Sequence, residues 1–221
     1  MKLILNAVTK FICGLALVGL MLFLPAGTLN YTGGWLFIAL LFIPVLIMGV
    51  VLYIKAPKLL EKRLDVKEKQ TAQKGVVALS GLGFLAGFIV SALDFRFGWS
   101  HVPAWLTAVA SVLFIASYGL YAEVMRENAY LSRTVKVEEG QSVVSTGLYG
   151  IVRHPMYSAT ILMFMMIPLM LGSLWGLLAF LHYPILMCVR AVNEEKLLSA
   201  ELEGYGEYKK KVKYRLIPFI W

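Results

Sequence analysis

Residues 156–189 read MYSATILMFMMIPLMLGSLWGLLAFLHYPILMCV, an apolar block too long for a single membrane crossing. Gly172 and Ser173 divide it into two segments of about 16 residues, each about 24 Å long as a helix. A helix that crosses the hydrocarbon needs roughly 20 apolar residues. We therefore expect a helical hairpin of two short spans, in locally thinned membrane or partly capped by protein, rather than one long tilted helix.

Four more apolar runs precede this block, at residues 8–27, 34–54, 76–93 and 105–125. The 221 residues are 59% hydrophobic and 15% charged, with a mean hydropathy of +0.74. Soluble domains are about 45–50% apolar and about 25% charged, so lipid must solvate much of this chain. We predict an all-α integral membrane protein with about six transmembrane helices. The last two form the hairpin, and a cytoplasmic C-terminal helix follows.

The basic residues orient these spans in the membrane. All but one of the 21 Lys and Arg residues fall in four places: the N-terminal segment, the 55–75 loop, the 126–155 segment and the tail from Arg190. Cytoplasmic loops carry an excess of basic residues. Six spans put these four places on one side and Arg96 alone on the other. We therefore expect both termini in the cytoplasm and no nucleic-acid partner.

The chain divides into two unequal parts. Residues 1–125 contain generic spans and are predicted to be a scaffold, whereas residues 126–221 contain most of the unusual polar residues and are predicted to be a catalytic region. Within the scaffold, Gly83 and Gly87 form a small-xxx-small pair that lets two helices approach closely. No strand is predicted before this glycine run, so we do not expect it to bind a nucleotide.

Two cysteines and one histidine lie within the apolar runs. Cys13 and Cys188 are far apart and lack metal-ligand spacing, so we expect neither a disulfide nor a metal site. His182 is the midspan histidine. Such a residue usually packs against a neighbouring helix, although a non-enzymatic transporter or scaffold would use it to line a polar path.

A polar motif, QSVVSTGLYGIVRHPMY, occupies residues 141–157 just before the hairpin. Arg153 and His154 stand where the first arm begins, and Pro155 falls in its first turn, where proline is tolerated. Helix N-termini favour anionic ligands. Tyrosine, arginine and histidine also anchor helices at membrane interfaces, so the motif alone is compatible with a binding site or an interfacial belt.

Two further clusters follow the hairpin. Arg190 and Glu194 share one helix face, and their charges suit a zwitterionic ligand or a surface ion pair. Tyr205, Tyr208 and Val212 follow helical spacing with lysines opposite. This pattern predicts an interfacial amphipathic helix that could also cover a pocket.

The order of these motifs is V-R-H-P-x-Y, a hairpin, R-x-x-x-E-E-x-x-L, Y-x-x-Y-x-x-x-V and I-P. It resembles the isoprenylcysteine carboxyl methyltransferase family and its phospholipid methyltransferase relatives over about residues 126–221. The resemblance implies an integral membrane enzyme that uses S-adenosylmethionine. It implies cofactor contacts from Gln141, Ser142, Val143, Val144, Tyr149, His154, Pro155, Met156, Tyr157 and Glu194. It also makes Arg190 and Glu194 the expected catalytic pair, with Arg190 on the substrate side.

The same resemblance implies a lipophilic or lipidated acceptor, with an isoprenylcysteine-like carboxylate as the expected group. Methyl transfer to a carboxylate requires alignment more than proton transfer. An amine or thiol acceptor would need a base, for which His154 or Glu195 are candidates. The chain departs from the family pattern at Ala159, where glycine is frequent, and at residues 202–203, where Phe-Gly is frequent.

A membrane reductase that uses NADPH is the alternative enzyme. Residues 214–218, YRLIP, are similar to the ending of sterol reductases. Those enzymes usually carry R-H-x-N-Y, whereas residues 153–157 here read RHPMY. The central motif therefore favours the methyltransferase.

Overall fold

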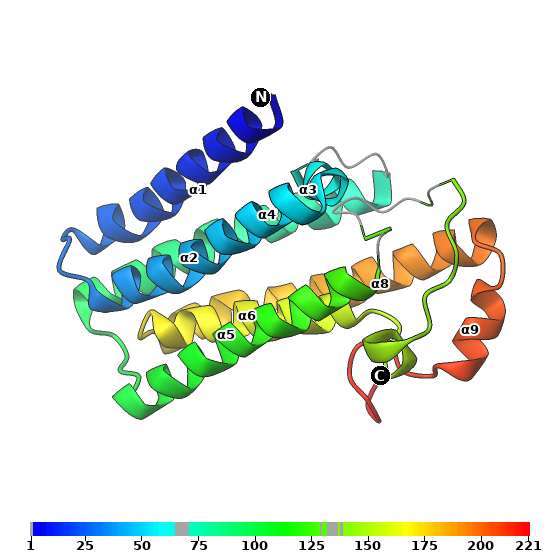
Figure 1. The fold of residues 1–221 in the computed structure, drawn as a ribbon. Helices are drawn as coiled ribbons and strands as arrows, with labels where there is room; N and C mark the ends of the chain where they lie inside the picture. Colours follow the sequence, from blue (N-terminus) through cyan, green and yellow to red (C-terminus); the bar gives the residue numbers. More distant parts are fainter. Residues whose placement is uncertain (1, 65–70, 129, 132–136, 138) are drawn as a thin grey trace.

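The computed structural model describes residues 2–64, 71–128, 130–131, 137 and 139–221. Within these ranges the regular elements are helices, as the composition predicts (Figure 1). Their bounds are α1 (Lys2–Ala26), α2 (Thr32–Lys55), α3 (Pro57–Leu64), α4 (Thr71–Phe97), α5 (Ala104–Glu127), the 3-10 turn η1 (Gly147–Gly150), α6 (Pro155–Met170), α7 (Leu174–Phe180), α8 (His182–Glu201) and α9 (Tyr205–Lys211).

In the part of the chain that the structure describes, five helical segments are long and apolar enough to cross a membrane. They are Lys2–Ala26, Thr32–Lys55, Gln73–Phe97, Ala104–Glu127 and Leu174–Glu201. The remaining expected span is the first arm of the hairpin, α6, an apolar helix of 16 residues that is short, as predicted, and falls below that length. Pro155 starts α6 and the Gly172 turn follows it, so the sequence itself limits the helix.

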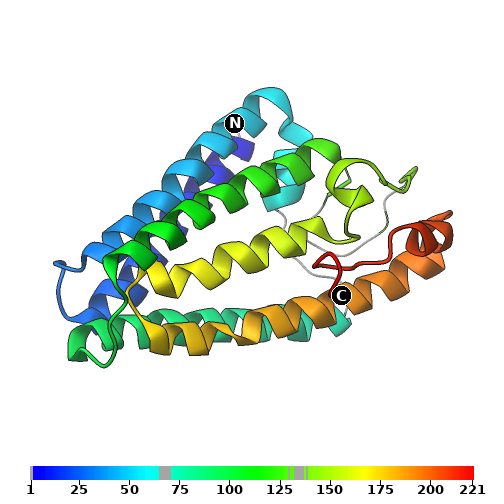
Figure 2. The same ribbon diagram turned by 90° about the horizontal axis from the view of Figure 1, so that it is seen from below.

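The predicted hairpin is present, but its arms are unequal. Figure 2 shows α6 between α5 on one side and α8 on the other. The second arm does not stop at Val189, because no glycine or proline follows until Gly204 and the helix continues to Glu201. This extension carries Arg190 and Glu194 on the same rigid element as the apolar span.

A buried carboxylate fixes the turn of the hairpin. Asp94 on α4 is 1% exposed and accepts hydrogen bonds from the backbone N–H and the hydroxyl of Ser100, at 2.7 and 2.5 Å. The hydroxyl of Ser173 also donates to it, and Ser173 in turn accepts from the N–H of Gly176 at the start of α7. A buried carboxyl group that is hydrogen-bonded in this way holds α4 against the hairpin.

Two glycines set the distance between α4 and the second arm. A side-chain carbon at Gly83 would overlap the ring of His182, and one at Gly87 would overlap Phe180. The small-xxx-small prediction is therefore confirmed as helix packing. His182 packs against α4, the common role for a midspan histidine.

Candidate functional site

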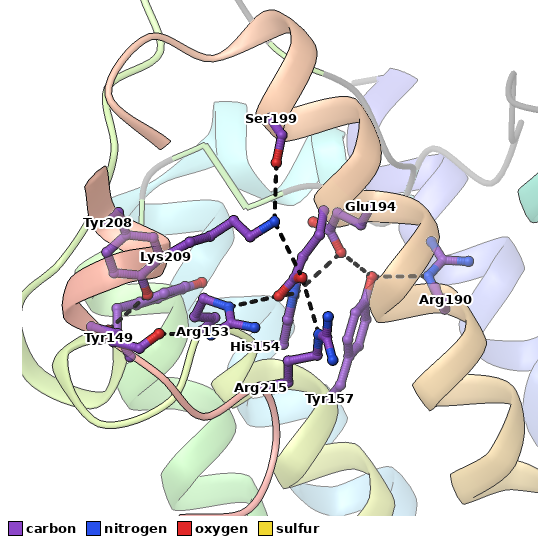
Figure 3. Close-up of polar contacts among 12 residues, drawn as sticks. Tyr149, Arg153, His154, Tyr157, Arg190, Glu194, Ser199, Tyr208, Lys209 and Arg215 are labelled. Atoms are coloured by element: carbon purple, nitrogen blue, oxygen red, sulfur yellow. Dashed lines mark hydrogen bonds and ion pairs between the residues drawn. The ribbon is translucent and has the colours of Figure 1, made fainter. Parts of the chain in front are cut away.

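The candidate site is an open cavity lined by residues of η1, α6, α8 and α9 and by residues that follow α5. These elements meet at one end of the helix bundle (Figures 1 and 3). The accessible volume of the cavity is about 90 Å³, and the space that includes its open mouth is about 790 Å³. Of the residues expected to contact a cofactor, all but Pro155 line it, and Arg190 lines it too. Pro155 is buried in the wall as the first residue of α6.

A chain of hydrogen bonds joins the hairpin's two arms across the cavity wall (Figure 3). The hydroxyl of Tyr157 on α6 donates to Glu194 Oε2 at 2.5 Å and accepts from Arg190 Nε at 3.1 Å. Arg190 is buried, while the side chain of Glu194 remains 25% exposed. Tyr157 thus fixes a guanidinium and a carboxylate one helical turn apart on α8.

His154 lies between two carboxylates. Its Nδ1 is 3.6 Å from Glu194 Oε2, and its Nε2 is 3.3 Å from Glu195 Oε1. The ring stacks on Tyr157 with centroids 5.4 Å apart. His154 therefore connects the cavity wall to a second, more deeply buried cluster.

Glu195 forms the centre of that second cluster. Its carboxylate is bound by Arg153 Nε at 2.6 Å and by Arg215 Nε at 3.0 Å, and the residue is 3% exposed. It does not line the cavity. This placement argues against Glu195 as a general base, because its oxygens are occupied by cations and turned from the cavity, and favours a structural role.

Tyr149 and Tyr208 connect η1 to α9 beside the cavity. Tyr208 donates to the Tyr149 carbonyl at 2.7 Å, and Asn128 Nδ2 donates to the Tyr149 hydroxyl at 2.9 Å. Burial raises the pKa of Tyr149 to about 12, mainly through loss of hydration. The phenol is therefore neutral at physiological pH.

Tyr205, the first residue of α9, also lines the cavity. It is 3% exposed, and its hydroxyl has no hydrogen-bond partner within the part of the chain that the structure describes. Burial, and then the charges of Glu195 and Glu194, raise the pKa of Tyr205. An unsatisfied buried hydroxyl is costly, so a ligand that reached it would gain a hydrogen bond.

Several cavity residues were missing from the expected site. They are Asn128, Tyr130, Leu131, Arg153, Leu198, Leu202, Tyr205 and Tyr208. Leu198 and Leu202 continue the four-residue spacing of Arg190 and Glu194. This spacing in the sequence could have predicted that they share the same face. Tyr205 and Tyr208 were expected only on a helix that could cover a pocket.

Residues 105–205 match the family model described as phospholipid methyltransferase. The delta(14)-sterol reductase TM7SF2 of Mus musculus is 30% identical to this chain over 91 residues, which cover 40% of the chain and 22% of the reductase. The chain thus matches only about a fifth of that relative's length. The family match includes every cavity residue except Tyr208, so the similarity to phospholipid methyltransferases lies in the part of the chain that builds the cavity.

Proposed function

We propose that this chain is an integral membrane methyltransferase that binds S-adenosylmethionine in the cavity and methylates a lipophilic acceptor. One observation carries the proposal: two motifs far apart in sequence, at residues 141–157 and 190–194, contribute side chains to a single cavity. The phospholipid methyltransferase match over residues 105–205 supports the same chemistry.

The side chains in the cavity fit this cofactor. Glu194 offers a partly exposed carboxylate to a cationic group, and Tyr205 offers an unsatisfied hydroxyl. Val143, Val144 and Leu198 supply apolar wall for a nucleobase. When bound, S-adenosylmethionine supplies a methyl group on a positively charged sulfur.

Arg190 is the residue we assign to the acceptor. A guanidinium binds a carboxylate through paired hydrogen bonds, and Tyr157 holds this one through Nε. The proposed acceptor is therefore a lipophilic carboxylate, such as an isoprenylcysteine-like group. Such an acceptor is already ionised, so the protein has to align it rather than deprotonate it.

Calorimetric titration of S-adenosylhomocysteine into the chain in lipid nanodiscs tests the cofactor. We expect saturable binding that Glu194→Ala and His154→Ala abolish or weaken at least tenfold. Glu207→Ala is the matched control, because Glu207 is an exposed carboxylate on α9 outside the cavity. Absence of binding to the unmutated chain would refute the proposal.

A reductase that uses NADPH is the second candidate, because the chain is similar to a sterol reductase over 91 residues. Against it, residues 153–157 read RHPMY rather than R-H-x-N-Y. Titration of NADPH in the same nanodiscs separates the two, since each enzyme binds only its own cofactor. Binding of neither compound would favour a non-enzymatic transporter or scaffold.

A further inference from the structure

The segment after α9 doubles back onto the start of the hairpin. The backbone N–H groups of Arg153 and His154 donate to the carbonyls of Tyr214 and Arg215, both at 2.9 Å. The hydroxyl of Ser158 donates to the carbonyl of Leu216 at 2.5 Å. The segment is therefore pinned along the first turn of α6.

Residues 217–220 form a closed loop beside that turn. The carbonyl of Trp221 accepts from the N–H groups of Arg215, Leu216 and Ile217 at 2.9 to 3.1 Å. Leu216 and Trp221, which flank the loop, pack with Met187 of α8. Since Met187 precedes Arg190 within the apolar span Leu174–Glu201, the loop lies at the level of apolar helix surface.

The loop turns apolar side chains outward. Ile217, Phe219 and Ile220 are 49%, 88% and 76% exposed. Phe219 has a φ of +66°, and within the described ranges it is the one non-glycine residue with a positive φ. This conformation is strained for a bulky residue. The loop therefore holds Phe219 in an unfavourable backbone conformation while its side chain stays largely exposed.

Basic side chains precede this apolar tip. Lys209, Lys210, Lys211 and Lys213 lie on α9 and just after it, and all are at least partly exposed. Residues 209–220 thus carry lysines followed by exposed apolar side chains, a combination that binds the interface of an anionic bilayer.

We propose that residues 217–220 insert into the bilayer in which the helices lie, with Phe219 among acyl chains and the neighbouring lysines at anionic headgroups. The membrane then holds the segment whose carbonyls accept from Arg153 and His154, and so supports one wall of the cavity. This inference requires a membrane but no methyl transfer, so it stands apart from the proposed function.

A nitroxide at Phe219→Cys tests the insertion. The chain would carry Cys13→Ala and Cys188→Ala and be reconstituted in phosphatidylcholine vesicles with or without phosphatidylglycerol. We expect frequent collisions of the label with oxygen and few with a water-soluble nickel chelate. The same label at Glu207→Cys, on the exposed face of α9, should show the reverse.

Each other outcome contradicts the proposal. Equal nickel accessibility at positions 219 and 207 would place the loop in water, and protection from both reagents would place it against protein. Phosphatidylglycerol should increase the oxygen-to-nickel ratio at position 219, and the combined Lys209→Gln, Lys210→Gln and Lys211→Gln variant should remove that increase. No effect of phosphatidylglycerol would overturn the assignment to anionic headgroups.

Discussion

Tyr205 and Tyr208 form a natural pair for testing the cavity at the level of single hydroxyls. Both are buried, but Tyr208 donates to the Tyr149 carbonyl, whereas the Tyr205 hydroxyl has no partner in the described part of the chain. We expect Tyr205→Phe to weaken S-adenosylhomocysteine binding about 3- to 10-fold, the equivalent of one hydrogen bond, and to raise the melting temperature of the ligand-free chain, because it removes an unsatisfied buried hydroxyl.

Tyr208→Phe should do the opposite, because it removes an internal hydrogen bond. We expect a loss of about 1 kcal/mol of unfolding free energy with a smaller effect on affinity. Calorimetry and thermal denaturation of both variants give the comparison. Equal affinities of Tyr205→Phe and the unmutated chain would show that the Tyr205 hydroxyl does not contact the ligand.

The adjacent carboxylates Glu194 and Glu195 are predicted to have different roles. Glu195→Gln leaves Arg153 buried without its counter-ion, and breaking such a pair costs about 3–5 kcal/mol. We therefore expect a clearly lower melting temperature. Glu194→Gln removes a partly exposed charge and should mainly reduce cofactor binding. If Glu195→Gln kept its stability and lost only binding, the assignment of Glu195 to the structure would be wrong.

The sequence predicted the site residues that belong to recognisable motifs. The residues expected at 141–157 and 190–194, apart from Pro155, line part of the cavity, whereas eight other lining residues were not expected. The separate tasks of Glu194 and Glu195 were not visible, because adjacent residues of a helix point in different directions and their partners come from elsewhere. Arg215, which separates these tasks by binding Glu195, lies 20 residues further along the chain.

At the level of elements, the contact between α4 and the hairpin's second arm depends on missing side chains. Gly83→Ala would place a methyl group in the ring of His182, and overpacking of this kind costs about 1–3 kcal/mol. We expect a lower melting temperature in detergent. Gly81→Ala is the matched control on the same helix, since nothing lies within 4 Å of its added carbon. Equal melting temperatures would contradict the close approach.

The turn of the hairpin gives a second prediction for an element. Asp94→Ala removes the acceptor shared by Ser100 and Ser173 and leaves both hydroxyls at the turn without it. We expect destabilisation of about 2–3 kcal/mol, whereas Arg96→Ala, a change at an exposed position two residues further along α4, should have little effect. Thermal denaturation of the two variants is the measurement. Equal decreases in melting temperature would show that the Asp94 hydrogen bonds do not specifically stabilise the turn.

The same turn shows which parts of the fold can be predicted from the sequence. Gly172 and Ser173 predicted where the apolar block folds back, because glycine and a helix-capping serine are local signals. Asp94 is 79 residues from Ser173, and no local pattern connects them. The length of α8 was underestimated for a related reason: apolarity marks where a span leaves the membrane, not where its helix ends.

For the whole molecule, the distribution of basic residues and the alternating direction of the long helices lead to one topology. The connection between α4 and α5 lies at the end of the bundle opposite α9 and the cavity (Figure 1). Only Arg96 among the basic residues falls near that connection. By the positive-inside rule we expect the cavity to face the cytoplasm. A cytoplasmic cavity would be accessible to the proposed water-soluble methyl donor, and the apolar helix surface beside it would be accessible to the proposed lipophilic acceptor.

This topology is tested with single cysteines in a chain that carries Cys13→Ala and Cys188→Ala. His101→Cys is exposed between α4 and α5, and Glu207→Cys is exposed on α9. In intact bacterial spheroplasts we expect a membrane-impermeant maleimide to label position 101 and not position 207, and both after lysis. Labelling of position 207 in intact spheroplasts would invert the molecule. It would put the cavity on the side without the cofactor, so the methyltransferase proposal would lose its methyl donor together with its orientation.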